Sequence, residues 1–250
     1  MPLNVPAGLF NLMSRLERLA AYAQGKGYGA ATTEQEVHLL QSLLRTQPKL
    51  AIDIGGNVGD YTAELRRRNP KLEVHIFEPS TTNIEKLTAR FENDSLIKLA
   101  PFALSDEART ATLFSNEPGS PMGSLTQRKL QHLQIAFETT ETINTIRFED
   151  YWKTALESRQ LDMVKIDIEG HELSALRGFG SALDSTRVLQ FEFGGTDIDT
   201  RTFFQDFWYF FRDRNFDLYR ITPLGAQKIT RYQESDEYFS ITNYIASNGR

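Results

Sequence analysis

The sequence predicts an α/β protein built on a largely parallel sheet. Apolar strand-like runs alternate with helical patterns over most of the chain, and this order is typical of a parallel sheet with helical crossovers. The clearest strand-like runs are LAIDI (50–54), LEVHIF (72–77), LIKLAPFAL (96–104) and LDMVKIDI (161–168). The helical patterns that follow them include residues 57–69, 82–92 and about 170–178. A glycine-rich turn directly after the first run lets the chain change sharply from strand to helix.

Composition excludes several classes of protein. The chain has 250 residues, of which 40 % are hydrophobic and 24 % charged, which fits a globular protein with one large domain or two small ones. The absence of cysteine excludes disulfides, thiolate metal sites and a cysteine nucleophile. A net charge of −5 argues against a dedicated nucleic-acid binder. No apolar run approaches the roughly 20 residues of a membrane span and no secretory signal is evident, so we expect a cytoplasmic protein.

Two helical segments precede the sheet. Residues 7–24 place their leucines on one helical stripe, which a series of glycines then ends. Thr33 and Glu36 have the spacing of a capping box that opens a second helix. We therefore expect an N-terminal helical cap over residues 1–48, ahead of a main domain over residues 49–250.

The region between residues 105 and 148 is less regular. TATLF (110–114) and INTIRF (143–148) are expected to form strands. The turn-rich stretch 116–126, which contains Ser120, Met122 and Ser124, resembles the loops that often cover active sites, although an ordinary mobile loop explains it equally well.

The C-terminal third completes the sheet. VLQFEF (188–193) predicts a further strand, and residues 199–214 predict an aromatic-rich helix. FDLYRI (216–221) and YFSITNYIA (238–246) predict closing antiparallel strands, which gives about seven strands in all. The aromatic helix is nearly apolar all round, so part of it could pack against a partner chain, giving a homodimer, or against the N-terminal helices.

The glycine-rich turn DIGGNVG (53–59) and an acidic residue at the end of the next strand, Glu78, indicate a cofactor site. Glycine lets the backbone approach a ligand closely, and an acid at the second strand tip can accept hydrogen bonds from ribose hydroxyls. A nucleoside-containing cofactor is therefore expected across these strand tips. The alternative is a simple turn in which Asp53 caps the helix.

Charge and spacing distinguish between cofactors. A dinucleotide fingerprint starting at Gly55 would need glycine where the sequence has Asn57 and Asp60, and no phosphate-binding loop motif is present. Asp53 would repel a pyrophosphate but attract a cation. S-adenosylmethionine carries a sulfonium and an ammonium group, so the charge favours this cofactor over a nicotinamide dinucleotide.

A second charged motif follows the run 161–168. Alternate residues of a strand share a face, so Lys165, Asp167 and Glu169 are expected on one side. An apolar parallel strand seldom ends in such a charged group without a function. If the strand order reverses beside the first strand, these side chains face the same crevice as Asp53.

These motifs together resemble the FkbM family of S-adenosylmethionine-dependent methyltransferases. The matching segments are DIGGNVGDYT (53–62), FEPSTTN (77–83), ALSD (103–106), GSL (123–125) and VKIDIEGHELSALRG (164–178). Their order and spacing match over roughly residues 50–246. Gly56 stands where the family more often has alanine, a difference that we expect to be harmless.

The resemblance implies a Rossmann-like class I methyltransferase fold: a seven-stranded mixed sheet with one antiparallel strand and helices on both faces. It also implies O-methylation of a hydroxyl on a sugar, glycan or secondary metabolite. The residues that it places at the cofactor are Asp53, Gly55, Asn57 and Gly59 at the methionine part, Glu78 and Pro79 at the ribose, and Ala103, Leu104, Ser105 and Asp106 near the adenine. It places Asp167, Glu169 and His171 toward the transferred methyl group.

Methyl transfer to an aliphatic hydroxyl needs a base or a metal to remove the proton. His171 lies near a helix N-terminus, which favours a neutral imidazole, although it could simply pack or cap the helix. Asp167 could be the base, a substrate clamp or a metal ligand, or could pair with Lys165. Glu169 could be the base or could cap the helix.

Metal and partner expectations follow from the same residues. Asp167, Glu169 and Glu192 could together hold Mg²⁺, but no tight carboxylate pair ends a strand, so a metal is not favoured. We expect a small-molecule or glycan acceptor and neither a nucleic acid nor a membrane span. The alternative function is a non-catalytic module that binds a nucleoside or a protein on the same fold.

Overall fold

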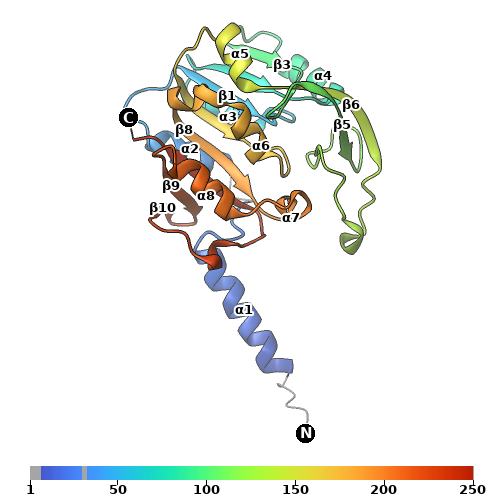
Figure 1. Ribbon diagram of the computed structural model, residues 1–250, viewed down its shortest axis with the longest axis vertical. Helices are drawn as coiled ribbons and strands as arrows, with labels where there is room; N and C mark the ends of the chain where they lie inside the picture. Colours follow the sequence, from blue (N-terminus) through green and yellow to red (C-terminus); the bar gives the residue numbers. More distant parts are fainter. Residues whose placement is uncertain (1–6, 30–32, 250) are drawn as a thin grey trace.

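An eight-stranded mixed sheet runs through the centre of the molecule (Figure 1). The computed structural model describes residues 7–29 and 33–249. The sheet has the order β10-β9-β11-β8-β7-β1-β2-β3. Its strands are β1 (Leu50–Ile54), β2 (Glu73–Phe77), β3 (Ile97–Ala100), β7 (Leu161–Ile166), β8 (Thr186–Phe193), β9 (Asp217–Thr222), β10 (Gly225–Ile229) and β11 (Thr242–Ser247).

Strand directions explain where the functional residues meet. The strands β3, β2, β1, β7 and β8 run parallel to one another, whereas β11 is antiparallel to both β8 and β9. The strand order reverses between β1 and β7, as expected, and ligands of such sheets bind outside the strand ends at this point. The expected seven-stranded arrangement is present, and the hairpin strand β10 adds an eighth strand that runs antiparallel to β9.

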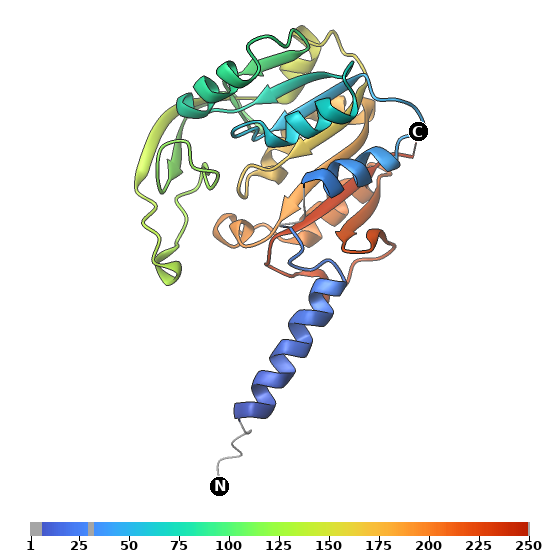
Figure 2. The same ribbon diagram turned by 180° about the vertical axis from the view of Figure 1, so that it is seen from behind.

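Helices cover both faces of the sheet (Figure 2). One face carries α5 (Phe148–Thr154), α6 (Glu172–Gly178) and α8 (Phe204–Arg212), and the other carries α2 (Thr33–Ser42), α3 (Asp60–Arg68) and α4 (Thr81–Arg90). Strand β1 shows why the faces separate cleanly, since Leu50, Ile52 and Ile54 belong to one hydrophobic cluster and Ala51 to the other.

The aromatic segment near residue 200 is divided into two helices, α7 (Thr196–Thr200) and α8, because Arg201 between them adopts a left-handed backbone conformation with φ 60°. The buried face of α8 packs on the sheet, where Phe191 stacks against Phe207 and Phe211. The sheet therefore accounts for the buried part of this apolar helix, and dimerisation through its remaining exposed face stays a prediction.

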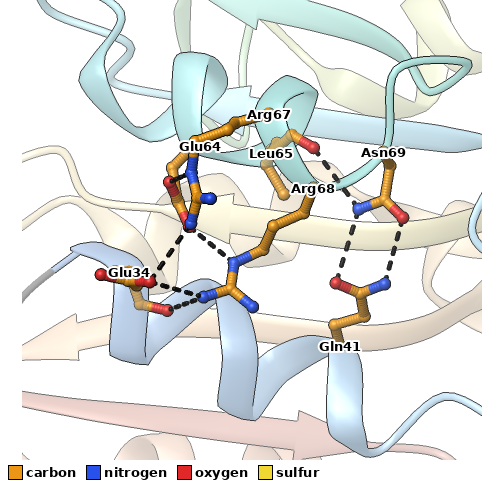
Figure 3. A network of polar contacts seen from close by, with 7 residues as sticks. All are labelled: Glu34, Gln41, Glu64, Leu65, Arg67, Arg68 and Asn69. Atoms are coloured by element: carbon orange, nitrogen blue, oxygen red, sulfur yellow. Dashed lines mark hydrogen bonds and ion pairs between the residues drawn. The ribbon is translucent and has the colours of Figure 1, made fainter.

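The two N-terminal helices are placed differently. Polar contacts fix α2 to α3: Arg67 and Arg68 both reach Glu34 and Glu64, and Gln41 bonds Asn69 (Figure 3). The long helix α1 (Ala7–Ala23) projects from the body and buries only Ala21 (Figure 1). Its exposed apolar side chains are Leu9, Phe10, Leu12, Met13, Leu16, Leu19 and Tyr22.

Glu36 departs from its expected role at the start of α2. A capping-box glutamate would accept a hydrogen bond from the helix N-terminus. Its two carboxylate oxygens instead accept hydrogen bonds from Gln190 and Asn243, at 2.8 and 3.2 Å. The capping-box prediction for Glu36 is therefore wrong, and the side chain belongs to a buried polar network.

A small second sheet carries the segment between residues 105 and 148. It contains β4 (Ala103–Leu104), β6 (Thr139–Ile146) and β5 (Arg109–Ser115) in the order β4-β6-β5. The chain between β5 and β6, residues 116–138, lies on the same side of the molecule as α7 in both views (Figures 1 and 2). In the ranges given above, no helix combines the length and apolar character that crossing a bilayer requires.

Candidate functional site

The glycine-rich turn after β1 brings two strand ends into close contact. The backbone N–H groups of Gly55 and Gly56 both donate hydrogen bonds to the carbonyl oxygen of Phe77 at the end of β2. Gly55 has a φ of +78°, and a Cβ there would lie 1.9 Å from the carbonyl oxygen of Asp167. Only glycine fits this position, so the turn can lie directly against the end of β7.

Asp53 lies in β1, just before the turn. Its side chain is fully buried, accepts a hydrogen bond from Thr62 at 2.6 Å and lies 3.9 Å from the ammonium of Lys165. Burial raises the pKa of the Asp53 carboxyl, while Lys165 and Thr62 oppose this effect. The carboxylate lines neither of the two cavities described below, so the structure does not present it directly to a ligand there.

Glu78 lies at the end of β2 and faces a cavity. Its two oxygens accept hydrogen bonds from the backbone N–H groups of Asn57 and Ser80, at 2.8 and 3.0 Å. Burial raises the pKa of Glu78, and these N–H groups oppose the effect. Asn57 has a positive φ of 46°, and its side-chain oxygen is buried without a hydrogen-bond partner. Hydrogen bonds thus hold the Glu78 carboxylate at the turn, and the side-chain oxygen of Asn57 can still accept a hydrogen bond.

Two cavities meet at the ends of β1 and β7. The first has a volume of about 230 Å³, and the second about 300 Å³. Both are lined by Gly55, Asn57, Pro121, Asp167 and Glu169. Glu78, Pro79, Ala103, Leu104 and His171 line only the first, whereas Glu36, Lys165, Glu192 and Asn243 line only the second.

Besides Asp53, three further expected cofactor residues, Gly59, Ser105 and Asp106, lie outside these cavities. Gly59 starts α3 with a φ of +86°, and a Cβ there would collide with Leu87 and Phe91. Ser105 and Asp106 face α6, where the Asp106 carboxylate accepts hydrogen bonds from Ser105 and Ser174. Their contacts are with neighbouring helices, so the expectation that they touch the cofactor stays a prediction.

The side chain of Glu172 stabilises the loop between β7 and α6, residues 167–171. This side chain is 1 % exposed, and its oxygens accept hydrogen bonds from the backbone N–H groups of Ile168 and Gly170. The sequence pattern alone predicts no role for Glu172 and allows Glu169 as the helix cap. In the structure Glu172 makes the local backbone contacts, and Glu169 lines the cavities.

Asp167 forms an ion pair with Lys165, with 3.2 Å between the charged atoms. Pairing with Lys165 is one of the alternatives that the sequence predicts for Asp167, and it forms where the chain leaves β7 after Ile166. Burial lowers the pKa of Lys165, but Asp167 and Asp53 outweigh this effect and raise it above its ordinary value. Lys165 therefore stays positively charged at physiological pH, and it lines the second cavity.

Glu169 is held at several points. Its backbone is left-handed, with φ 56°, a conformation that costs free energy in a residue other than glycine. Ser124 donates a hydrogen bond to its carbonyl oxygen, and Arg128 lies 2.9 Å from its carboxylate. Burial, with Asp167, raises the pKa of Glu169 to about 7, while Arg128 opposes the rise. A carboxyl group with this pKa can exchange a proton near neutral pH.

His171 precedes α6 and lines the first cavity. Its Nε2 atom lies 2.9 Å from the hydroxyl of Thr126. Burial lowers the pKa of His171 to about 4, and the positive charge of Arg109 adds to this effect. The imidazole is neutral at physiological pH, as the sequence predicted, but burial has the larger influence.

The carboxylates considered for Mg²⁺ all line the second cavity. Asp167 and Glu169 are each already paired with a cation, Lys165 and Arg128 respectively. Burial and the neighbouring carboxylates raise the pKa of Glu192. In the described part of the chain, no group of three or more histidine or acidic side chains has an arrangement that could hold a metal ion.

Comparison with known proteins places this site in a family. The methyltransferase FkbM domain model matches residues 53–218. The 2-O-methyltransferase NoeI of Sinorhizobium fredii is 27 % identical over 199 residues, which cover 75 % of this chain and 80 % of that protein. The hexuronic acid methyltransferase AglP of Haloferax volcanii is 29 % identical over 139 residues, which cover 55 % of this chain and 52 % of that protein.

A solved structure shares the fold. The crystal structure of methyltransferase FkbM from Methylobacillus flagellatus matches with a TM-score of 0.52 at 16 % identity, over 85 % of this chain. The chain spans about half the length of that protein, 47 %. The family model covers more than half of this chain, including the glycine turn, Glu78 and the β7–α6 loop. The chain therefore belongs to the FkbM methyltransferase family.

Proposed function

We propose that this methyltransferase uses S-adenosylmethionine and methylates a hydroxyl group of a sugar, glycan or secondary metabolite. The observation that carries the proposal is the meeting of two cavities at Asp167 and Glu169, where β1 and β7 end. A donor and an acceptor hydroxyl must lie in line at roughly 3–3.5 Å for methyl transfer. Adjoining cavities that share acidic residues provide such a meeting point.

The cavity residues fit an adenosylated cation. In the first cavity, Glu78 would accept hydrogen bonds from the ribose, and Ala103 and Leu104 would contact the base. The second cavity has five acidic lining residues and the single cation Lys165. Burial raises the pKa of Glu36, Glu169 and Glu192, so a positively charged ligand would favour their ionisation and be stabilised by it. The acidic residues are Glu36, Asp60, Asp167, Glu169 and Glu192. The unpartnered side-chain oxygen of Asn57 is a further acceptor at the boundary between the two cavities.

S-adenosylmethionine would supply a methyl group on a sulfonium that is already a good leaving group. The protein must then orient the acceptor hydroxyl and remove its proton. Of the three candidates, Glu169 has a pKa of about 7, which suits a general base. Asp167 is paired with Lys165, and His171 has its Nε2 next to the Thr126 hydroxyl. We assign proton removal to Glu169 and orientation of the bound ligands to Asp167 and His171.

The relatives support oxygen on a sugar as the acceptor. One is a 2-O-methyltransferase and another is a hexuronic acid methyltransferase by name. The N-terminal segment, outside the family match, contributes Gly29, Thr33 and Glu36 to the second cavity. We propose that this segment helps to select the acceptor.

The test has a binding step and a transfer step. We expect S-adenosylmethionine and S-adenosylhomocysteine, but not NAD, to raise the melting temperature, since a ligand at 100 times its Kd stabilises by about 2.7 kcal/mol. Glu78→Gln should weaken both, whereas the exposed control Glu85→Gln should not. A panel of hexuronic acids and neutral glycan fragments is then screened for gain of one methyl group by mass spectrometry. Stabilisation by NAD alone would refute the proposal.

A further inference from the structure

The segment between β5 and β6 contacts the β7–α6 loop with alternate residues. Ser124 bonds the carbonyl oxygen of Glu169, the Thr126 hydroxyl lies beside Nε2 of His171, and Arg128 pairs with the carboxylate of Glu169. These three contacts place residues 124–128 of the segment directly against the loop that carries the candidate catalytic residues.

Arg128 is the charged member of this series. Its side chain is 11 % exposed and lies 2.9 Å from Glu169 and 3.7 Å from Asp199 of α7. A guanidinium holds a carboxylate in a fixed geometry better than a flexible ammonium does. Because Asp199 also faces Arg128, the arginine connects the segment, the β7–α6 loop and α7.

We propose that Arg128 is a positioning residue that acts through Glu169, holding its carboxylate ionised and directed at the acceptor while the β5–β6 segment lies across the cleft. The inference rests on the proposed function. In the reaction, the hydroxyl proton passes to Glu169, the acceptor oxygen forms a bond to the methyl carbon, and the carbon–sulfur bond breaks with its electron pair left on sulfur.

The charges around Glu169 determine how readily its carboxyl group ionises, and Arg128 is the foremost of those that favour ionisation. Those that disfavour its ionisation lie on β7–α6, α7 and β8, and those that favour ionisation are Arg128 and Lys165. The groups that interact with it are Asp167, Lys165, Glu192, Asp197 and Arg128. Asp199 faces Arg128, and the neutral His171 lines the first cavity together with Glu169. Lys165 is already paired with Asp167, so Arg128 is the direct cationic partner of Glu169 among these groups.

The first test measures the titration of Glu169 without any ligand. Carbon-13 NMR of protein labelled at glutamate carboxyl groups follows the resonance that is lost in Glu169→Gln. Arg128→Gln should move its midpoint upward by about 1 pH unit or more, since an adjacent opposite charge shifts a carboxyl pKa by about 1–3 units. Arg128→Lys should restore most of the shift, and the neighbouring exposed Lys129→Gln should leave the midpoint unchanged. An unmoved midpoint in Arg128→Gln would overturn the inference.

The second test links this titration to the ligand. The affinity for S-adenosylmethionine relative to the uncharged-sulfur product S-adenosylhomocysteine is measured by calorimetry from pH 5.5 to 8.5. The ratio should rise as Glu169 ionises, lose this rise in Glu169→Gln, and show a higher midpoint in Arg128→Gln. If the wild type binds both compounds but Arg128→Gln keeps the wild-type midpoint, only the positioning role fails. If the wild type binds neither compound, the proposed function fails, and the inference fails with it.

Discussion

Ser124 donates a hydrogen bond of 2.7 Å to the main-chain carbonyl oxygen of Glu169, across a sequence separation of 45 residues. Ser124 is 1 % exposed and also forms a bridge with Phe114 of β5 through its backbone. The contact attaches the turn-rich stretch 116–126 to the candidate catalytic loop. It also restrains Glu169 in its left-handed backbone conformation.

The change Ser124→Ala should therefore destabilise the fold and loosen the site together. The Glu169 carbonyl would lose a buried donor, which costs about 1–3 kcal/mol. We expect a lower free energy of unfolding in urea and weaker binding of S-adenosylhomocysteine by calorimetry. The exposed serine Ser95 provides the control Ser95→Ala, in which neither quantity should change. Equal behaviour of the two variants would show that the contact does not restrain the loop.

The sequence was sufficient to predict features that depend on local pattern. The strand–turn–helix at Asp53–Gly59 and the buried strand before Asp167 were recognisable because period, glycine and charge lie within a few neighbouring residues. The strand order that brings these segments together followed from the rules of parallel sheets. The resemblance to the FkbM family pointed to the same site, and the family itself is confirmed.

Contacts between distant segments could not be predicted in this way. The local sequence around Arg128 does not indicate a partner 41 residues away. The side chain pairs with Glu169 because the β5–β6 segment folds onto the β7–α6 loop. Asp53 was expected to face a cationic ligand, but its side-chain direction places it against Thr62. The glycine spacing predicts the turn after β1, but it does not determine the direction in which the Asp53 carboxylate points.

Glu36 should make stability fall as the pH rises. Burial, partly offset by Gln190 and Lys165, raises the pKa of Glu36 from 4.5 to about 7. Between these values the unfolded chain loses the proton while the folded protein keeps it, so ionisation favours unfolding. Linkage gives about 3 kcal/mol of lost stability at pH 7 relative to pH 4.

The variant Glu36→Gln removes this contribution. Urea unfolding at pH 4 to 7 should show its free energy of unfolding rising relative to wild type across the window. Glu34→Gln, on the same helix and exposed, should keep the wild-type slope. A constant difference between Glu36→Gln and wild type at every pH would contradict the predicted titration.

His171 should make stability fall as the pH drops, which is the opposite of the effect of Glu36. Burial lowers its pKa from 6.5 to about 4, so between these values the unfolded chain binds a proton that the folded protein does not. Stability should therefore fall as the pH drops, by about 2 kcal/mol from this residue at pH 5. His171→Gln should remove that loss, whereas the exposed His132→Gln should not. Parallel pH profiles for wild type and His171→Gln would rule out a buried neutral histidine.

Gly56 tests how closely the turn fits the sheet. The resemblance to the FkbM family makes alanine the expected residue here, but in this structure a Cβ at Gly56 would lie 2.2 Å from Cγ2 of Ile76, a fully buried side chain of β2. Since φ is not left-handed at Gly56, the collision alone opposes a side chain. Gly56→Ala should thus lower the free energy of unfolding by about 1–3 kcal/mol, as overpacking of a core usually does.

A double-mutant cycle separates collision from any other cause. Ile76→Ala alone should destabilise by about 2–5 kcal/mol, because it leaves a cavity. In the double variant Gly56→Ala/Ile76→Ala, the new methyl group occupies part of that space, so the cost of Gly56→Ala should largely disappear. The control Gly123→Ala should be tolerated, since a Cβ there meets its nearest atom at 3.5 Å. If the two changes at Gly56 and Ile76 were simply additive, the substitution at Gly56 would act on the turn itself rather than through β2.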